Sequence, residues 1–412
     1  MSSLNCQSSQ RPRIKRHNLV TAAPSRTVDA AIVGGGIAGL WIYNALRRQG
    51  YSAVLFEADA LGCDQTLASQ GMIHGGLKYA LSGALTQASE AIAQMPKRWQ
   101  ACLDGDLNAA GDVSLAGVPI QSQHYYMFAE RSGIGSLTSF FASKTLRGRI
   151  DKVAQANWPD SLQGLRGVVY QLNDFVMDTR SLLQHLANQY PDGIYRHSIS
   201  QQNTEKRADG YLIQTGESGT DSLLADTLIC CAGNGSVPLI KEFGIQLAVQ
   251  QRPLKQVIVH TTHHQPLYAH CLTGVASAEP RLTITTDHRD GHSVWYLGGK
   301  LATSGVNRSD AEQISFAKQE LQRCLGWLDW DNAQYQTLWV NRAEPAQASG
   351  LRPDNAYVGR DGHFLLCFPT KLTLTPDLAD QVLAQLPPPK HPTLEALDLP
   401  SVRIGDSPWQ IN

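Results

Sequence analysis

The sequence predicts an α/β protein with a parallel sheet at its centre, into which an α+β domain with a mainly antiparallel sheet is inserted. The first observation is an apolar run, Val28–Val33, that ends in three glycines and leads directly into a helical pattern. The second is another strand-like run, Ser52–Phe56, which completes a strand–helix–strand unit. The third is a group of strand-like runs far from that unit, before strand and helix patterns return near the C-terminus. They are Val257–His260, Leu282–Thr286 and Ser293–Leu297.

The composition is that of an ordinary globular protein and excludes some classes of function. The 412 residues carry a formal net charge of −1, so no global field would attract nucleic acid. No apolar run approaches the ~20 residues that a membrane-spanning helix needs. We therefore expect no transmembrane segment and no nucleic-acid partner.

The first 27 residues differ from the rest of the chain. They contain five Lys and Arg residues and no acidic one, which predicts a flexible basic tail, with a transit peptide or a contact with an anionic surface as alternatives. The eight cysteines form no C-x-x-C pair, which is typical of a reducing compartment. We expect a cytoplasmic protein and leave open a peripheral contact with a membrane.

The glycines after the first strand fit the G-x-G-x-x-G pattern of a dinucleotide site. Gly34 allows the tight turn, Gly36 lets the backbone approach a pyrophosphate, and Gly39 lets helix and strand pack closely. Glu57 ends the next strand, where a carboxylate can accept both ribose hydroxyls. The alternative is a glycine turn without a ligand. The residues expected at this site are Gly34, Gly36, Ile37, Ala38, Gly39, Glu57 and Ala58.

These nucleotide-binding elements lie at the start, middle and end of the chain, so the domains are expected to be discontinuous. Long helices are expected at Leu81–Leu103, Asp178–Tyr190, Asp310–Leu325 and Asp377–Leu386. The expected divisions are a tail at 1–27, a Rossmann-like nucleotide-binding domain at 28–100, 165–250 and 340–390, an inserted substrate or cap domain at 101–164 and 251–339, and a C-terminal tail at 391–412.

The segment Cys63–Tyr79 reads CDQTLASQGMIHGGLKY and resembles the flavin-contacting segment of the D-amino-acid oxidase superfamily, a branch of the glutathione-reductase-type flavoproteins. Its Ile73–Tyr79 part is similar to the I-H-G-G-L-R-Y of FAD-dependent glycerol-3-phosphate dehydrogenases. The resemblance implies FAD as cofactor, where glycines let the backbone lie against the flat flavin ring. By position, it implies contacts with FAD from Thr66, Ser69, Gln70, Gly71, His74, Gly75 and Gly76.

Three further segments are similar to the same superfamily. Leu228–Asn234 resembles its second cofactor strand, Gly350–Pro353 its G-[LV]-R-P, and Phe364–Ala379 its closing strand, turn and helix, with T-K-L-T in place of G-K-L-T. The resemblance implies FAD contacts from Ala232, Gly233, Arg352, Lys371, Leu372 and Thr373. The chain departs from the pattern at Lys78, at Phe368-Pro369-Thr370, and in lacking the extra C-terminal domain of glycerol-3-phosphate dehydrogenases. These departures leave the substrate open.

Several side chains are candidates for the chemistry. Arg352 is the expected anchor of a substrate anion, helped by Lys78 or Lys371, since arginine binds carboxylate or phosphate in bidentate geometry. Its alternative is an ion pair with Asp354 or Glu344. Lys371 is also expected to add a full positive charge that stabilises the reduced flavin, and its alternative is an exposed lysine in a turn.

The closing helix and two further side chains complete the candidates. Thr375 is expected to cap the closing helix, whose N-terminus can stabilise charge on a reduced flavin. His74 is a candidate base or point of covalent attachment, or a packed histidine, and non-covalent FAD is favoured. Tyr296 and Trp295 alternate on one strand, so only one of them can face the flavin cavity, and packing of both in the core is the alternative.

Other cofactors are not indicated. His260, His263, His264 and His270 do not have zinc spacing, so no metal is expected. No second glycine fingerprint suggests NAD(P)H, and no cysteine pair suggests a disulfide reductase.

The sequence thus indicates an FAD-dependent oxidase or dehydrogenase that takes a hydride from a small anionic substrate. An amino acid or secondary amine (C–N bond) is favoured, with glycerol 3-phosphate or a 2-hydroxy acid (C–O bond) as alternative. A flavin-binding RNA-modification or regulatory protein is the alternative of another class. The electron acceptor, oxygen or a quinone, is left open.

Overall fold

The computed structural model describes residues 24–76, 87–130, 150–216, 221–261, 265–272, 279–289, 292–347, 353–393 and 395–409. Two candidate site residues, Lys78 and Arg352, lie outside these ranges, as do His263, His264 and most of the basic N-terminal segment. Within the described ranges, no helix is long and apolar enough to cross a membrane.

The first sheet contains the strand–helix–strand unit predicted from the sequence. Its strands run in the order β10-β11-β12-β1-β2-β9, with β19 added beside β12 and β18 beside β19. The neighbours β12, β1, β2 and β9 are parallel, and so are β12 and β19. The bounds are β1 (Arg26–Val33), β2 (Ala53–Glu57), β9 (Ile194–Arg196), β10 (Thr204–Arg207), β11 (Gly210–Gln214), β12 (Ser222–Cys230), β18 (Tyr357–Asp361) and β19 (Phe364–Phe368).

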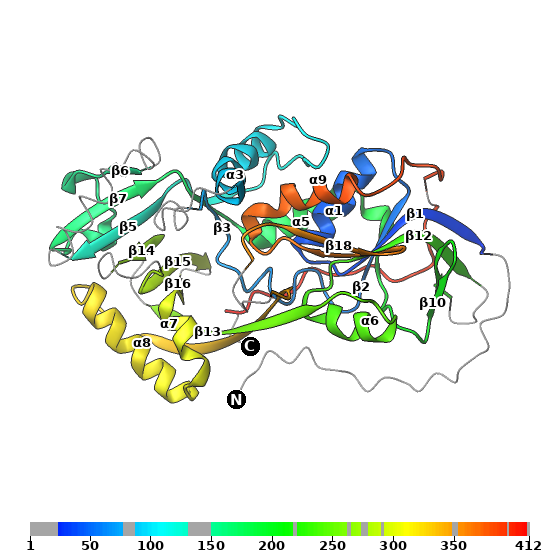
Figure 1. Cartoon of the computed structure of the whole chain (residues 1–412). Coiled ribbons are helices and arrows are strands. Elements are labelled where there is room, and N and C mark those ends of the chain that lie inside the picture. Colours follow the sequence, from blue (N-terminus) through cyan, green and yellow to red (C-terminus); the bar gives the residue numbers. More distant parts are fainter. Residues whose placement is uncertain are drawn as a thin grey trace.

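Helices cover both faces of this sheet (Figure 1). Alternate residues of β1 point to opposite sides: Ile32 joins the core under α1, α5 and α9, whereas Val33 joins the core under α6. Burial on both faces is typical of parallel sheets and explains the continuous apolar runs in the sequence. The helices are α1 (Ile37–Arg48), α5 (Thr179–Gln189), α6 (Ser236–Glu242) and α9 (Thr375–Leu383).

The second sheet is mainly antiparallel, and the predicted fold class is confirmed. Its order is β17-β13-β16-β15-β14-β5-β7-β6, in which β14 and β5 are parallel. Helix α8 (Asp310–Leu325) packs on one face through Ala317 and Leu321. The bounds are β5 (Tyr125–Glu130), β6 (Ile150–Lys152), β7 (Gly167–Leu172), β13 (Val249–Thr261), β14 (Ala269–Cys271), β15 (Leu282–Arg289), β16 (His292–Gly298), β17 (Gln334–Pro345) and α7 (Lys300–Ser304).

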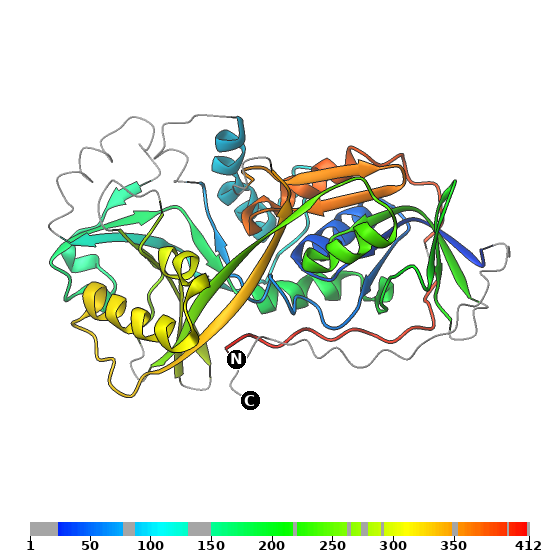
Figure 2. The same ribbon diagram turned by 60° about the horizontal axis from the view of Figure 1, so that its bottom comes forward.

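Two long strands connect the domains (Figure 2). β13 and β17 pair from Val249↔Pro345 to His260↔Gln334. The sequence predicted strand only at the apolar end of β13, because its first half, including Arg252 and Lys255, is polar. Strand β17 supplies the hydrogen-bonding partners of this half, and the local sequence pattern does not predict such pairing.

Some expected domain divisions differ from the packing. β7 belongs to the second sheet, although the boundary at 165 assigned it to the nucleotide-binding domain. Conversely, Val113 and Leu115 lie in the core of the first domain, although 101–164 was assigned to the cap. A small third sheet has the order β3-β8-β4, with bounds β3 (Met72–Ile73), β8 (Phe175–Met177) and β4 (Ile120–Ser122).

The segment after residue 391 is not a free tail. Its backbone pairs with that of Leu61, which donates to Arg403 O and accepts from Gly405 N–H, both at 2.9 Å. Arg196 N–H also donates to Pro400 O at 2.8 Å. The C-terminal segment therefore follows the edge of the first domain, and it ends, within the described residues, at Trp409 beside the second sheet.

Candidate active site

The glycines of the first turn are required by the protein's own backbone at two positions. A Cβ on Gly39 would lie 1.9 Å from Gly34 O, and one on Gly34, which has a φ of +105°, would lie 2.7 Å from Cys231 O. At Gly36 the nearest atom to such a Cβ is Thr66 Oγ1, at 3.2 Å. Gly34 and Gly39 thus bring strand and helix together, while Gly36 meets no backbone.

The N-terminus of α1 is suited to an anion. Its N-cap residue, Gly36, has no side chain that could cap it, and its first turn contains no acid. Ile37 N–H donates to Thr66 Oγ1 at 3.1 Å. The remaining N–H groups of the first turn and the helix dipole can stabilise a phosphate.

Glu57 ends β2 directly beside this turn. Its carboxylate accepts from Gly35 N–H at 2.6 Å and from Asp59 N–H at 2.9 Å. Burial raises its pKa above the ordinary range, and the backbone N–H groups oppose that rise. These bonds hold the carboxylate at the end of the strand, with Ala58 following it.

The next segment joins the two domains. Gln70 Nε2 donates to Thr283 O at 3.1 Å and to Tyr296 O at 3.0 Å, both in the second sheet. Gly71 has a φ of +65°, and a Cβ there would lie 2.3 Å from Met177 O. The segment Ser69–Gly71 is therefore fixed between the inserted sheet and the start of α5.

The loop at His74–Gly76 is held by backbone N–H groups. His74 N–H donates to Thr373 Oγ1 at 2.8 Å, Gly75 N–H to Asp174 Oδ1 at 2.9 Å, and Gly76 N–H to His74 Nδ1 at 3.2 Å. The imidazole thus accepts a bond from its own loop. Asp174 was missed by the sequence reasoning, because nothing near it in the chain points to Gly75.

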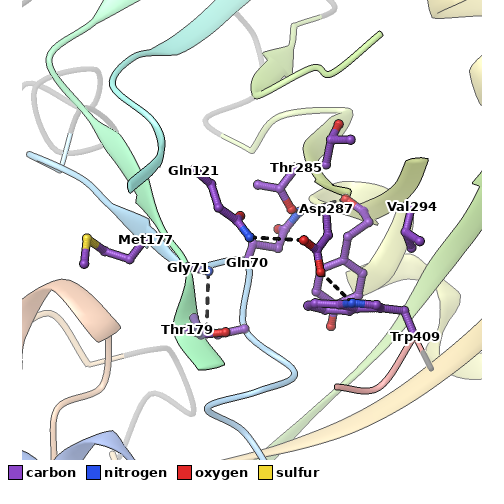
Figure 3. A pocket seen from close by; sticks show the side chains of 12 residues that line it. Gln70, Gly71, Gln121, Met177, Thr179, Thr285, Asp287, Val294 and Trp409 are labelled. Atoms are coloured by element: carbon purple, nitrogen blue, oxygen red, sulfur yellow. Dashed lines mark hydrogen bonds between the residues drawn. The ribbon is translucent and has the colours of Figure 1, made fainter. Parts of the chain in front are cut away.

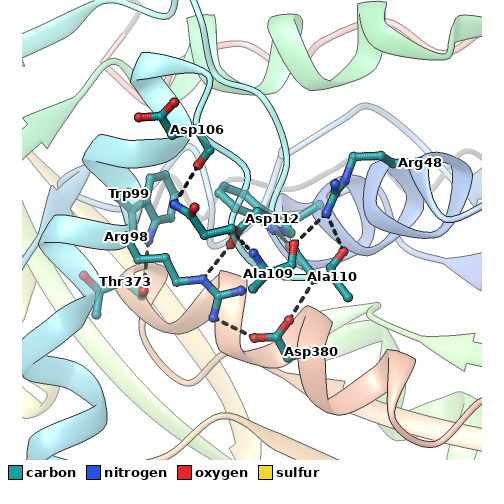
Figure 4. A network of polar contacts seen from close by, with 12 residues as sticks. Arg48, Arg98, Trp99, Asp106, Ala109, Ala110, Asp112, Thr373 and Asp380 are labelled. Carbon is teal, nitrogen blue, oxygen red and sulfur yellow. Dashed lines mark hydrogen bonds and ion pairs between the residues drawn. The ribbon is translucent and has the colours of Figure 1, made fainter.

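Helix α3 (Gln87–Asp104) braces the closing segment (Figure 4). Trp99 Nε1 donates to Thr373 O at 2.9 Å. Arg98 bridges Asp112 at 2.6 Å and Asp380 of α9 at 2.7 Å. This network fixes α9 and Thr373 relative to α3, and the sequence reasoning missed it.

Lys371 is buried, not an exposed turn lysine. Its Nζ donates to Asp354 O at 3.0 Å and Pro353 O at 3.4 Å, and lies 3.6 Å from Asp354 Oδ1. Thr370 before it has a φ of +58°, the left-handed conformation that glycine favours. The chain therefore keeps the turn geometry of a G-K-L-T segment with threonine at its first position.

The prediction that Thr375 caps α9 is wrong. The helix begins at Thr375 itself, with Leu374 as its N-cap residue and no side-chain cap. Thr375 Oγ1 donates to Leu372 O at 2.7 Å instead. The reason is the 3₁₀ turn Leu372–Leu374, which leads directly into α9 and shifts its start. An uncapped N-terminus of α9 remains available to stabilise negative charge.

Tyr296 and Trp295 lie on opposite faces of β16. Trp295 packs edge-on against Trp330, with ring centroids 5.4 Å apart, in the core under α8. Tyr296 lies on the face that contacts Ala68, and its hydroxyl bonds to Ala68 O and Gln256 Oε1. Burial raises the pKa of Tyr296 far above its ordinary value, so this hydroxyl is suited to holding the backbone beside Ser69.

Ala232 and Gly233, two of the residues expected at the cofactor, follow β12 directly. They lie beside the glycine turn, where a Cβ on Gly34 would meet Ala232 Cα at 2.7 Å. Asp354 and Glu344 were the two acids considered as ion-pair partners of Arg352. Asp354 lies beside Lys371, and Glu344 accepts a hydrogen bond from Arg252 at 2.7 Å.

Comparison with known proteins decides the family. The family model described as FAD dependent oxidoreductase matches residues 29–376. The chain belongs to this family. It is an FAD-dependent oxidoreductase of the D-amino-acid oxidase group, as the resemblance in the sequence indicated.

A probable FAD-dependent oxidoreductase of Pseudomonas aeruginosa is 44% identical over 395 residues, which is 93% of this chain and 98% of the relative. The crystal structure of an FAD-dependent oxidoreductase from the same organism has a TM-score of 0.77 at 37% identity and covers 94% of this chain and 99% of that one.

More distant structures share the fold. Glycine oxidase from Geobacillus kaustophilus has a TM-score of 0.59 at 16% identity, with 88% of this chain and 95% of that chain covered. L-α-glycerophosphate oxidase from Mycoplasma pneumoniae, with FAD bound, has a TM-score of 0.63 at 16% identity, with 90% and 98% covered. At this identity the likeness shows the fold alone.

The residues present fit FAD. The glycine turn and the N-terminus of α1 suit the pyrophosphate, Glu57 suits the adenosine ribose, and the loop at His74 is bonded to the closing turn at Thr373. No metal was expected at the four histidines. The structure describes two of them, His260 in β13 and His270 in β14, both strands of the second sheet.

Proposed function

We propose that the protein oxidises a small substrate with an anionic group, and that a C–N bond, as in an amino acid or secondary amine, is the preferred bond. Bound FAD supplies the acceptor for a hydride equivalent. The role of the chain is to bind the substrate, orient it and stabilise charge that develops on reduction.

The observation that carries the proposal is the burial of Lys371. Its ammonium group anchors Pro353 and Asp354, the two residues that directly follow Arg352 in the chain, to the closing turn. A lysine that is only 5% exposed loses much of its hydration, and the three oxygens around it offset that loss. We infer that this clamp serves to present Arg352 to a substrate anion.

A carboxylate is preferred over a phosphate. The chain has Lys78 where the similar segment of glycerol-3-phosphate dehydrogenases has arginine, and an ammonium group cannot form the bidentate fork that suits phosphate. The C–O alternative is supported by the I-H-G-G-L and K-L-T segments and by the shared fold of a glycerophosphate oxidase. Glycine oxidase shares the fold at the same identity, so the fold does not separate the two.

The test is anaerobic reduction of the bound flavin, followed by absorbance, with amino acids, N-substituted glycines, 2-hydroxy acids and glycerol 3-phosphate. Arg352→Ala should raise KM with unchanged FAD content and cost about 2–4 kcal/mol in kcat/KM, the value of a desolvated charge pair. Arg323→Ala, on the exposed face of α8, is the control. A neutral amine that reduces both proteins equally well, with no anionic compound doing better, would contradict the proposal.

We also infer that FAD is bound without a covalent bond, since no cysteine or histidine lies in a pattern that compels attachment. Acid precipitation of the protein should give a colourless pellet and a yellow supernatant. A yellow pellet would instead direct attention to His74.

A further inference from the structure

The C-terminal segment, residues 395–409, is fixed to the first domain at successive points. Leu397 N–H donates to the Tyr195 hydroxyl at 2.8 Å, and the Arg180 guanidinium donates to Gly405 O. Figure 2 shows the segment, in red, running along the first domain toward the second. Its course is therefore set by the first domain before it reaches the second sheet.

The same segment packs against the flavin-contacting segment, which begins at Cys63. A Cβ on Gly405 would lie 3.0 Å from Leu67 Cδ1 and 3.1 Å from Cys63 Cα, so the two stretches of chain are in close contact. Leu67 directly precedes Ala68, whose carbonyl oxygen accepts from the Tyr296 hydroxyl. The C-terminal segment thus lies against one part of the flavin-contacting segment, and the second sheet holds the next residue along.

The end of the C-terminal segment meets the second sheet beside Tyr296 (Figure 3). The Trp409 indole packs against the Tyr296 ring, with centroids 5.5 Å apart and planes inclined by 57°. Its Nε1 donates to Asp287 Oδ2 at 2.8 Å, and Asp287 also accepts from Gln121 Nε2 at 3.4 Å. Trp409 therefore contacts two neighbouring strands, β15 through Asp287 and β16 through Tyr296.

Little space is left around these contacts. A cavity of about 20 Å³ lies among Ser69–Gly71, Thr285–Asp287 and Tyr296, and Trp409 closes one side of it. This volume has room for a water molecule and is too small for a substrate. Trp409 packs on the apolar cluster that contains Ala68 and Tyr296, so its indole fills the gap between the flavin-contacting segment and the second sheet.

Tyr296 carries two links from the second sheet to the flavin-contacting segment. Its hydroxyl bonds to Ala68 O, and its backbone oxygen accepts from Gln70 Nε2 at 3.0 Å. The Tyr296 ring joins these two atoms, so a side chain that fixes the ring also fixes both bonds. Among the described residues, Trp409 is the ring paired with Tyr296, which gives the C-terminal segment a direct hold on this junction.

We propose that Trp409 is a positioning residue for the flavin. It holds the ring of Tyr296 and, through Tyr296, the backbone at Ala68 and the side chain of Gln70. The C-terminal segment thereby sets how closely the second sheet approaches the flavin-contacting segment. The inference concerns the surroundings of FAD and is independent of the substrate proposed above.

The test compares FAD-loaded Trp409→Ala with Trp339→Ala, a control at a tryptophan of the second sheet that is 39% exposed. Circular dichroism in the flavin band reports the surroundings of the flavin, and titration of the FAD-free protein with FAD gives Kd. We expect Trp409→Ala to alter the flavin band and to weaken FAD binding about 3- to 10-fold, since an aromatic pair and a hydrogen bond to a carboxylate are lost. Trp339→Ala should match wild type in both signals.

Further variants separate positioning from folding. Trp409→Phe keeps a ring beside Tyr296 and should recover most of the wild-type flavin band. Trp409→Leu keeps apolar bulk and should show the alanine effect to a smaller extent if the alanine variant does not fold. Combined with Tyr296→Phe, Trp409→Ala should change Kd by less than the product of the two single effects, because both act on one junction.

Thermal unfolding of the FAD-free variants completes the test. A Trp409→Ala variant that unfolds at a lower temperature but keeps the wild-type flavin band and Kd would overturn the inference, because Trp409 would then support the fold alone. Equal changes in Trp339→Ala, or independent effects of the changes at Trp409 and Tyr296, would overturn it too. None of these measurements needs turnover, so they remain decisive even if no tested compound reduces the flavin and the proposed function fails.

Discussion

The nucleotide end of the site, residues 34–57, and the cavity closed by Trp409 are built in opposite ways. The nucleotide end is one continuous stretch in which neighbouring residues meet: Gly39 packs on Gly34, and Glu57 bonds to Gly35. The cavity collects residues from across the chain, with Trp409 bonded to Asp287. The comparison shows that the glycine turn and its neighbouring acid are encoded locally, whereas the wall at Trp409 depends on single long-range contacts.

The largest loss of stability is expected at Gly39, where the backbone of Gly34 leaves no room for a side chain. Gly39→Ala places a Cβ 1.9 Å from Gly34 O, so β1 and α1 must separate, at a cost of about 3 kcal/mol or more. FAD retention should be lost with it. Urea unfolding and released-flavin absorbance measure both. Gly50→Ala is the matched control, because its φ is +84° but nothing lies within 4 Å, and it should cost about 1 kcal/mol.

A smaller effect is expected at the clamp that links the closing turn to Pro353 and Asp354. Lys371→Met removes an ammonium group that donates to Pro353 O and Asp354 O and lies 3.6 Å from the Asp354 carboxylate. The Asp354 side chain is half exposed, so the loss should be about 2 kcal/mol, less than for a fully buried pair. Urea unfolding measures the loss, with Lys206→Met on an exposed strand position as control. Equal stabilities of the two variants would show that the clamp is not structural.

The next effect tests a single contact between the domains. Tyr296→Phe removes the hydroxyl that bonds to Ala68 and Gln256, at an expected cost of about 1–2 kcal/mol because buried acceptors lose a partner. Tyr335→Phe, at a partly exposed tyrosine of β17, should change stability little. If Tyr296→Phe alone also alters the flavin spectrum, the inserted sheet positions the flavin-binding segment.

The smallest effect concerns Glu57 in the FAD-free protein. Burial raises the pKa of Glu57, so the folded protein favours its protonated form. Its contribution to stability is therefore greatest below the pKa of the unfolded chain, about 4.3, and is lost as pH rises through the folded value. Glu57→Gln should accordingly stabilise the FAD-free protein more at pH 7 than at pH 4, while weakening FAD binding. A gain that is larger at pH 4 would contradict this reasoning.

Features formed by neighbouring residues could be predicted from the sequence, whereas features formed by distant residues could not. The sequence predicted the strand and helix around Gly34–Gly39, and α8 at Asp310–Leu325 with its bounds, because local periodicity defines both. It did not predict the first half of β13, whose polar residues form a strand only against β17. It also placed β7 in the wrong domain, since a boundary has no local signal where the chain crosses between two sheets.

The sequence by itself determined that the chain has a dinucleotide site, because the spacing of the glycines and the acid at the end of the second strand can be read locally, and the resemblance of Cys63–Tyr79 to the D-amino-acid oxidase superfamily indicated FAD. The tertiary structure alone decided that Lys371 is buried, that Tyr296 bonds to Ala68, 228 residues away, and that Trp409 closes a cavity beside Asp287, 122 residues away. These contacts arise when the two sheets and the C-terminal segment pack together. Local propensity carries no information about a partner so distant in the chain.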